Sequence, residues 1–282
     1  MGLGGMRIAA AGALGIALSA CTATIDQSIF FPQNVPPPRT TLTPPAGYAM
    51  SEAMLALPGL GTIHAVRLDN PRSETVIVYS GGNGGFVSAF SPFAARLADA
   101  TGADLILYDY PGRGGTDVAP TIEAAIATGP LLVRELRQRG WIGRGPLFAY
   151  GTSFGGSQAA AMARGGGFDG LILEGTTSDI AGVGRNFVPG VAKPFVRLQV
   201  DPALLRFDYL GYAIAAHAPI LLISSRDDRV VRPRNASDFA GQLRALGATL
   251  EEITAPGGHG SALADAETRA AIGRFVAGHG AR

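Results

Sequence analysis

A serine flanked by glycines follows an apolar stretch near the middle of the chain. Residues 147–150 are apolar, Gly151-Thr152-Ser153-Phe154-Gly155 comes next, and small residues follow. This pattern predicts a strand, a tight turn and a helix, with the Ser153 hydroxyl projecting above a sheet. Glycines two positions before and after the serine leave room for the neighbouring strand and helix. Ser153 is a candidate nucleophile, although a chain with 40 glycines could also contain such a turn with an idle serine.

A serine needs a base to become a useful nucleophile, and the chain offers four histidines. His259 lies in a glycine-flanked loop directly after the last predicted strand, where an imidazole could reach the tip of another strand. His64 falls within an early strand, His217 precedes a strand at the wrong end of a sheet, and His279 lies in the C-terminal Gly-His-Gly. We therefore predict that His259 is the base; the alternative is a polar loop residue.

The acid that orients the base should also follow a strand. Asp227 and Asp228 both follow the apolar run at 220–223, and on the residues alone either could face Nδ1 of His259. The resulting chain order, Ser…Asp…His, is the order found in α/β hydrolases.

Apolar strands alternate with helices from about residue 50 onward. This alternation predicts an α/β fold with a mostly parallel eight-stranded sheet, helices on both faces, and a site at the carboxyl ends of the strands. The predicted strands are 53–57, 62–68, 75–79, 104–108, 147–150, 170–174, 220–224 and 249–254. The predicted helices are 92–100, 122–139 with a break at Gly129-Pro130, 154–164, 235–246 and 262–277.

Two further motifs resemble the α/β-hydrolase superfamily, and the resemblance covers roughly residues 48–280. Residues 109–116, Asp-Tyr-Pro-Gly-Arg-Gly-Gly-Thr, resemble its Asp-x-x-Gly-x-Gly-x-Ser turn, and residues 225–231 resemble its Gly-x-x-Asp-x-x-Val acid loop. The register of the second motif selects Asp228, so that Asp227 would be a solvated neighbour or an ion-pair partner. The resemblance implies the α/β-hydrolase fold with a short lid segment.

An oxyanion hole needs two backbone N–H donors aimed at the developing charge. Phe154 is expected to supply one, and the loop Ser-Gly-Gly-Asn-Gly-Gly at 80–85 the other. This loop resembles the His-Gly-Asn-Ala loop of the Bem-like serine peptidase and esterase branch, with serine or glycine where histidine is usual. We predict the N–H of Asn83, with Gly82 as the next choice; a flexible glycine turn is the structural alternative.

These residues together predict acyl transfer. Ser153 would attack a carbonyl, His259 would move the proton, and Asp228 would steady the imidazolium. We expect a serine hydrolase that cleaves carboxylic esters, because an ester leaving group needs less help than an amide. A peptidase or amidase on the same triad, and a catalytically silent envelope lipoprotein, are the alternatives.

No cofactor or metal is required by this mechanism. The Gly-x-Gly-x-x-Gly run at 165–170 follows a helix and opens a strand, the reverse of a dinucleotide-binding turn.

The segment at 176–218 is expected to set substrate choice as a short lid. Its apolar residues could line an acyl pocket or equally pack beneath the lid; they are Ile180, Val183, Phe187, Val188, Val191, Phe195 and Val196.

The first 20 residues predict an export signal outside the fold. Arg7 precedes an apolar run at 8–18 that is too short to span a bilayer as a helix. Leu18-Ser19-Ala20-Cys21 resembles the bacterial lipoprotein signal, and Cys21 is the only cysteine. The resemblance implies a lipid anchor at Cys21 and a place in the cell envelope facing the periplasm, with Thr22 favouring the outer membrane. An ordinary secretory signal with a chance cysteine and an uncleaved anchor are the alternatives.

The composition of the remaining chain predicts its domain limits and its partners. A proline-rich tether is predicted at 21–47, with the apolar Ile29-Phe30-Phe31 able to dock on a hydrolase domain at 48–282. A content of 47% hydrophobic and 16% charged residues supports a buried core. The net charge of +1, without a basic run, suggests neither nucleic acid nor an acidic membrane surface as a partner. The predicted partners are a small ester or amide substrate and a membrane, through the anchor.

Overall fold

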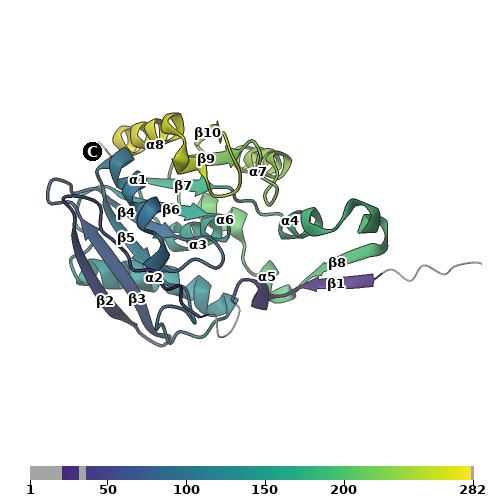
Figure 1. Cartoon of the computed structure of the whole chain (residues 1–282), viewed down its shortest axis with the longest axis horizontal. Helices are drawn as coiled ribbons and strands as arrows, with labels where there is room; N and C mark the ends of the chain where they lie inside the picture. The colour runs from purple at the N-terminus through teal and green to yellow at the C-terminus, as the bar shows by residue number, and fades with distance from the viewer. Residues whose placement is uncertain (1–20, 32–35, 281–282) are drawn as a thin grey trace, which may run out of the picture.

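An eight-stranded sheet organises the fold in the computed structural model, which describes residues 21–31 and 36–280 (Figure 1). The strand order is β10-β9-β7-β6-β4-β5-β3-β2. The pairs β2–β3 and β3–β5 are antiparallel, and the other neighbours are parallel, so the predicted mostly parallel sheet is confirmed. The strands are β2 (Ala49–Leu57), β3 (Gly61–Asp69), β4 (Val76–Ser80), β5 (Asp104–Tyr108), β6 (Leu147–Thr152), β7 (Gly170–Glu174), β9 (Ile220–Ser225) and β10 (Leu250–Ala255).

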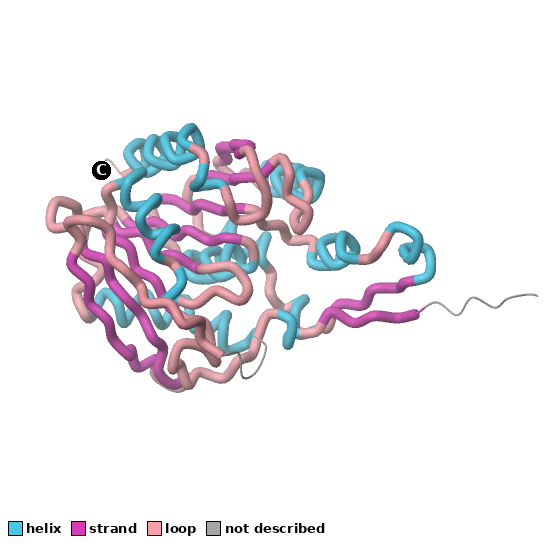
Figure 2. The backbone as a smooth tube through the Cα atoms, viewed as in Figure 1, coloured by secondary structure: helices cyan, strands magenta, loops and turns pink. Residues whose placement is uncertain are grey.

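Helices cover both faces of this sheet (Figure 2). Side chains of α1 and α8 share one apolar cluster with the sheet, and those of α2, α3, α6 and α7 share the other. Strands β4 to β7 are buried along their whole length because both of their faces are covered. The helices are α1 (Ser91–Thr101), α2 (Ile122–Gln138), α3 (Phe154–Ala163), α6 (Tyr209–Ala215), α7 (Pro233–Ala245) and α8 (Ala266–His279).

Helix α2 runs through Gly129-Pro130 without the predicted break. Proline removes the N–H that would bond the carbonyl four residues earlier. That carbonyl, on Ile126, instead accepts a hydrogen bond from Nη1 of Arg164 at 3.1 Å. Gly129 lies so close to α3 that an added Cβ would meet Cα of Met162 at 2.8 Å. The prediction of a break was wrong because Arg164, directly after α3, donates to the carbonyl that the proline leaves without its helical partner.

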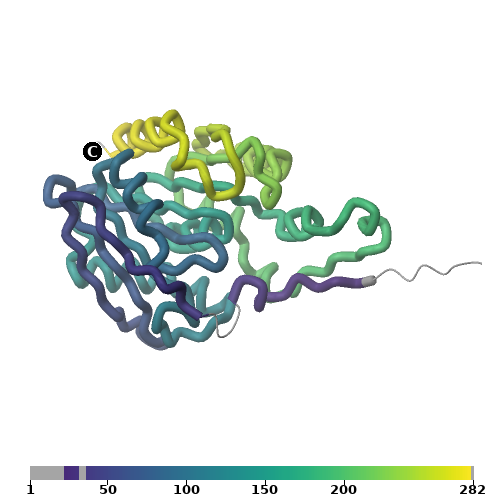
Figure 3. The backbone as a smooth tube through the Cα atoms, in the orientation of Figure 1, coloured from purple at the N-terminus to yellow at the C-terminus, as the bar shows by residue number. Residues whose placement is uncertain are grey.

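A two-stranded ribbon lies outside the main sheet. Strand β1 (Cys21–Ile25) pairs in parallel with β8 (Val196–Val200), and α4 (Ile180–Phe187) and a 3-10 helix, η3 (Gly190–Phe195), precede β8. We call β1 together with residues 180–200 the arm. Figures 1 and 3 show that the arm projects from the rest of the molecule.

The first part of the predicted tether at 21–47 is folded. Residues 21–31 form β1 and a 3-10 helix, η1 (Gln27–Ile29), and Phe31 is buried as the docking prediction requires. Ladder hydrogen bonds and burial of apolar side chains therefore hold the start of this segment in the fold, and an extended tether does not describe it. The predicted signal at 1–20 lies outside the described residues, in which no helix has the length and apolar character to cross a bilayer.

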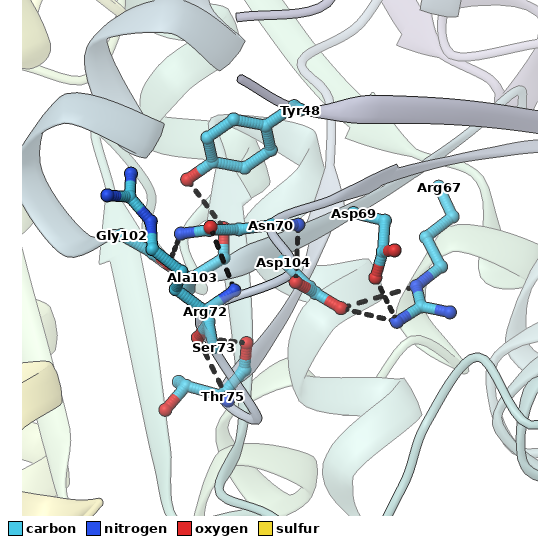
Figure 4. A network of polar contacts seen from close by, with 10 residues as sticks. All are labelled: Tyr48, Arg67, Asp69, Asn70, Arg72, Ser73, Thr75, Gly102, Ala103 and Asp104. Carbon is cyan, nitrogen blue, oxygen red and sulfur yellow. Dashed lines mark hydrogen bonds and ion pairs between the residues drawn. The ribbon is translucent and has the colours of Figure 1, made fainter. Parts of the chain in front are cut away.

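A polar network lies where β5 begins, at the end of the sheet opposite Ser153. Figure 4 shows its residues around Asp104. Asp104, at the start of β5, accepts hydrogen bonds from Nη2 of Arg67 at 2.6 Å and from the N–H of Asn70 at 2.9 Å. Burial raises the pKa of Asp104, and the bonds from Arg67 and Asn70 oppose that shift. The network ties the turn between β3 and β4 to the start of β5 and the residues just before it.

A second polar group joins β3 to the loop after β5. Nδ1 of His64 lies 2.6 Å from Oδ2 of Asp109, and its Nε2 lies 2.7 Å from Oε1 of Glu52. Oδ1 of Asp109 accepts the N–H of Val87 at 2.9 Å. The hydrogen bond to Asp109 raises the pKa of His64 against the opposing effect of burial.

We predict that His64 makes stability fall as pH rises above about 6.5, the ordinary histidine pKa. A raised pKa means that the folded chain holds the proton more tightly than the unfolded chain does. The contribution is therefore complete below that pH and is lost as pH rises through the raised pKa of the folded protein. Urea unfolding of wild type and His64→Gln across this range should show their stability difference shrinking with pH. Parallel stability curves would contradict the assignment.

Candidate active site

Ser153 sits on the turn between β6 and α3 with φ 56° and ψ −124°, a conformation rare for a residue with a side chain. Its N–H donates to the carbonyl of Glu174 at 2.8 Å, which ties the turn to the end of β7. A Cβ at Gly151 would lie 2.2 Å from the carbonyl oxygen of Gly155, and a Cβ at Gly155 would lie 2.0 Å from that of Ser80. Only glycine fits at both positions, so the close approach of strand and helix forces the serine outward.

His259 and Asp228 form a hydrogen-bonded pair beyond the ends of β10 and β9. Nδ1 of His259 lies 2.8 Å from Oδ2 of Asp228. Oδ1 of Asp228 accepts the N–H groups of Val230 at 2.8 Å and Val231 at 2.9 Å. Asp228 is buried and fixed by these three bonds, whereas Asp227 is exposed. Of the two aspartates, the structure therefore places Asp228 against the histidine. The bond uses Nδ1 of His259, so Nε2 is the ring nitrogen that does not face Asp228.

Ser153 and His259 line the same cavity, which has a volume of about 540 Å³. A cavity of this size suits a small organic molecule. Its walls are mostly apolar, and α4 contributes Ile180, Val183 and Phe187. The other apolar residues expected there, which are Val188, Val191, Phe195 and Val196, do not line the cavity.

The loop after β4 passes beside Ser153. An added Cβ at Gly82 would lie 3.7 Å from Cβ of Ser153, and both Gly82 and Asn83 line the cavity. Within the described residues, neither of their backbone N–H groups donates a hydrogen bond. Phe154 is the first residue of α3, and its N–H has no partner inside the helix. The arrangement offers backbone donors on either side of the serine.

The N-terminal segment supplies a wall of the cavity that sequence reasoning missed. Ile25, Ile29 and Phe30 line it. The ring of Phe30 stacks on Phe154 with centroids 4.6 Å apart. Nδ2 of Asn83 donates to the carbonyl of Ile29 at 2.8 Å. The segment therefore contacts both the helix behind the serine and the loop in front of it.

Arg113 joins the N-terminal segment to the loop after β4. Its guanidinium donates to the carbonyl of Phe30 at 3.0 Å, to that of Gly85 at 3.3 Å, and to Oδ1 of Asn83 at 3.3 Å. Arg113 is buried, and that burial lowers its pKa. The sequence placed this residue in a family-like turn but gave no sign of its partners, which are distant in the chain.

Glu174 is a second residue that the sequence analysis did not single out. Its buried carboxyl group accepts the Tyr150 hydroxyl at 2.7 Å and the Thr152 hydroxyl at 3.2 Å with Oε2, and the N–H of Ala262 at 3.0 Å with Oε1. These bonds connect the strand before Ser153 to the chain just after His259. The available signal was a charged residue closing the apolar run Leu-Ile-Leu of β7.

The described residues contain no cluster of His, Cys, Asp and Glu side chains suited to a metal ion. What the site offers is a serine on a strained turn, a histidine paired with a buried aspartate, and backbone donors around one apolar cavity. These are the parts that nucleophilic acyl transfer uses.

Comparison with known proteins finds similarity in structure and not in sequence. No protein-family model and no curated protein matches the chain. An esterase of Pyrococcus furiosus matches 87% of this chain and 100% of its own, with a TM-score of 0.68 and 15% identity. Carboxyl esterase 2 of the fungus Tuber melanosporum matches 89% and 94%, with a TM-score of 0.64 and 18% identity. A thermostable esterase from Pseudomonas putida matches 81% of each chain, with a TM-score of 0.55 and 19% identity. At identities this low, the likeness shows a shared fold.

Proposed function

We propose that this chain, which has the α/β-hydrolase fold, is a serine hydrolase that cleaves carboxylic esters. The observation that carries the proposal is that Ser153 and His259 line one mainly apolar cavity, with His259 hydrogen-bonded to the buried Asp228. The solved structures that share the fold are described as esterases, which supports ester cleavage.

The mechanism follows from the atoms available. Nε2 of His259 takes the Ser153 proton as Oγ attacks the ester carbonyl, and Asp228 stabilises the imidazolium through Nδ1. The N–H of Phe154 and that of Asn83 or Gly82 stabilise the oxyanion. The imidazolium then protonates the leaving alcohol, and water, activated by the same histidine, releases the acid from the acyl-enzyme.

We predict that Ser153→Ala abolishes fluorophosphonate labelling and lowers kcat for p-nitrophenyl esters by about 10⁴-fold or more. Asp228→Asn should lower kcat by about 10⁴-fold, because its amide N–H₂ would face Nδ1 of His259 and favour the imidazole tautomer that carries the proton on Nε2. Asp227→Asn is the matched control and should retain activity, since Asp227 is exposed beside the buried pair. Equal labelling of wild type and Ser153→Ala would end the enzyme proposal and favour a silent scaffold. Faster cleavage of aminoacyl anilides than of esters would favour a peptidase of the Bem-like kind.

The apolar walls favour an acyl group of small to medium length. Phe30 closes one side of the cavity by stacking on Phe154, and α4 closes another with Ile180 and Val183. The size of the group accepted should therefore depend on the N-terminal segment as well as on the lid.

We predict that Phe30→Ala raises the ratio of kcat/KM for octanoate over acetate esters by about tenfold, since a few methylenes gain room. The control is Phe93→Ala, which removes a ring stacked on Tyr79 with centroids 3.8 Å apart, outside the cavity wall. An unchanged chain-length profile for Phe30→Ala would show that this ring does not limit the acyl group.

We also propose that the chain is lipid-anchored at Cys21 in a bacterial cell envelope. The support is the lipoprotein-like Leu-Ser-Ala-Cys sequence and the position of the only cysteine. Incorporation of an alkyne fatty acid during expression should label wild type and not Cys21→Ala. Absence of label from the wild-type chain would rule out the anchor.

A further inference from the structure

Exposed apolar side chains gather on the arm. Phe187 is 68% exposed, Val191 is 86% exposed and Phe195 is 41% exposed, all within the short stretch from the last residue of α4 to the start of β8. Figures 1 and 3 show this stretch at the projecting end, away from the main sheet. Exposed apolar groups this close together indicate a surface that meets another phase or partner.

The part of the arm at residues 180–200 is positively charged, which favours a negatively charged partner. Residues 180–200 contain Arg185, Lys193 and Arg197 and no acidic residue. None of these three cations forms an ion pair with any described residue. Because the whole chain has a net charge of only +1, the remainder of the molecule is net negative. Basic side chains among exposed apolar ones suit the interface of a membrane that contains anionic lipid.

The path of the chain points to the same partner. Cys21, the proposed lipid attachment site, pairs with Val196 in the ribbon, directly after the exposed Phe195. Four residues further on, Ile25 lines the cavity, as does Phe187 on the facing helix. The ribbon thus runs from the apolar tip of the arm to the wall of the candidate active site.

We propose that the arm is a membrane-docking surface for bilayers containing anionic phospholipid. Phe187, Val191 and Phe195 enter the boundary between headgroups and acyl chains, while Arg185, Lys193 and Arg197 meet lipid phosphates. Docking brings the cavity beside Phe187 to the membrane surface. On the proposed esterase function, the substrate is then an acyl ester that partitions into the membrane.

The docking is tested by placing a fluorophore on the arm of the full-length chain. In a Cys21→Ala background, Val191→Cys is labelled with an environment-sensitive dye, and Leu246→Cys at the end of α7, where Leu246 is 54% exposed, is the matched control. Vesicles contain phosphatidylcholine with or without phosphatidylglycerol, and flotation verifies that both labelled proteins are attached. We expect a blue shift and quenching by lipid-linked nitroxide at position 191 with phosphatidylglycerol, and an aqueous signal at position 246. An aqueous signal at 191 on floated vesicles, or a blue shift that depends on protein concentration without vesicles, would overturn the proposal, the latter by indicating a second copy of the chain.

A second measurement separates docking from catalysis. Val191→Ser combined with Phe195→Ser changes exposed residues outside the cavity wall. Hydrolysis of a dissolved short-chain ester should stay at the wild-type rate, whereas hydrolysis of an acyl ester embedded in phosphatidylglycerol vesicles should fall about tenfold. Leu246→Ser should change neither rate. Equal rates on the embedded ester would overturn docking as the route to substrate, whereas a wild-type chain that cleaves neither ester would overturn the esterase function and leave the fluorescence result standing.

Discussion

The approach of α3 to strands β6 and β4 is the constraint on which the site depends. Glycines at 151 and 155 allow the backbones to come closer than any side chain would permit. The positive φ of Ser153 costs on the order of 1–3 kcal/mol, and the bond from its N–H to the Glu174 carbonyl helps to hold the turn in place. With the serine fixed there, parallel strands bring the other parts to the same edge: the glycine loop follows β4, Asp228 follows β9 and His259 follows β10.

Buried polar groups then hold these loops relative to one another. Glu174 accepts from both Thr152 and Ala262, so the strand before the serine and the chain after the histidine share one carboxyl group. Arg113 donates to Phe30 and Asn83, which joins the N-terminal segment to the glycine loop. A buried charged group with several hydrogen bonds favours one arrangement of its neighbours, because any other arrangement leaves it unsatisfied.

The sequence predicted those parts whose position depends on local pattern. Continuous apolar runs marked the central strands, and residues directly after them marked the edge where Ser153, Asp228 and His259 lie. Features that depend on contacts between residues far apart in the chain could not be predicted from local sequence pattern. The continuity of α2 depends on Arg164, which satisfies the Ile126 carbonyl, and β1 depends on β8, a partner far along the chain. The prolines of residues 21–47 suggested a tether before the domain. The residues that pair with β8, at 21–25, and the docked Phe31 come before those prolines in the chain.

The docked N-terminal segment limits how the proposed anchor could present the site. A long flexible tether would let the cavity take any orientation at a membrane, and its effective concentration there would depend only on the reach of the tether. Here the ladder begins at Cys21 and ends at the cavity wall with Ile25. A lipid attached at Cys21 would therefore act at the tip of a ribbon whose other end belongs to the cavity. Because that ribbon is paired along its whole length, the distance between such a lipid and the cavity would be set by folded structure and not by chain flexibility.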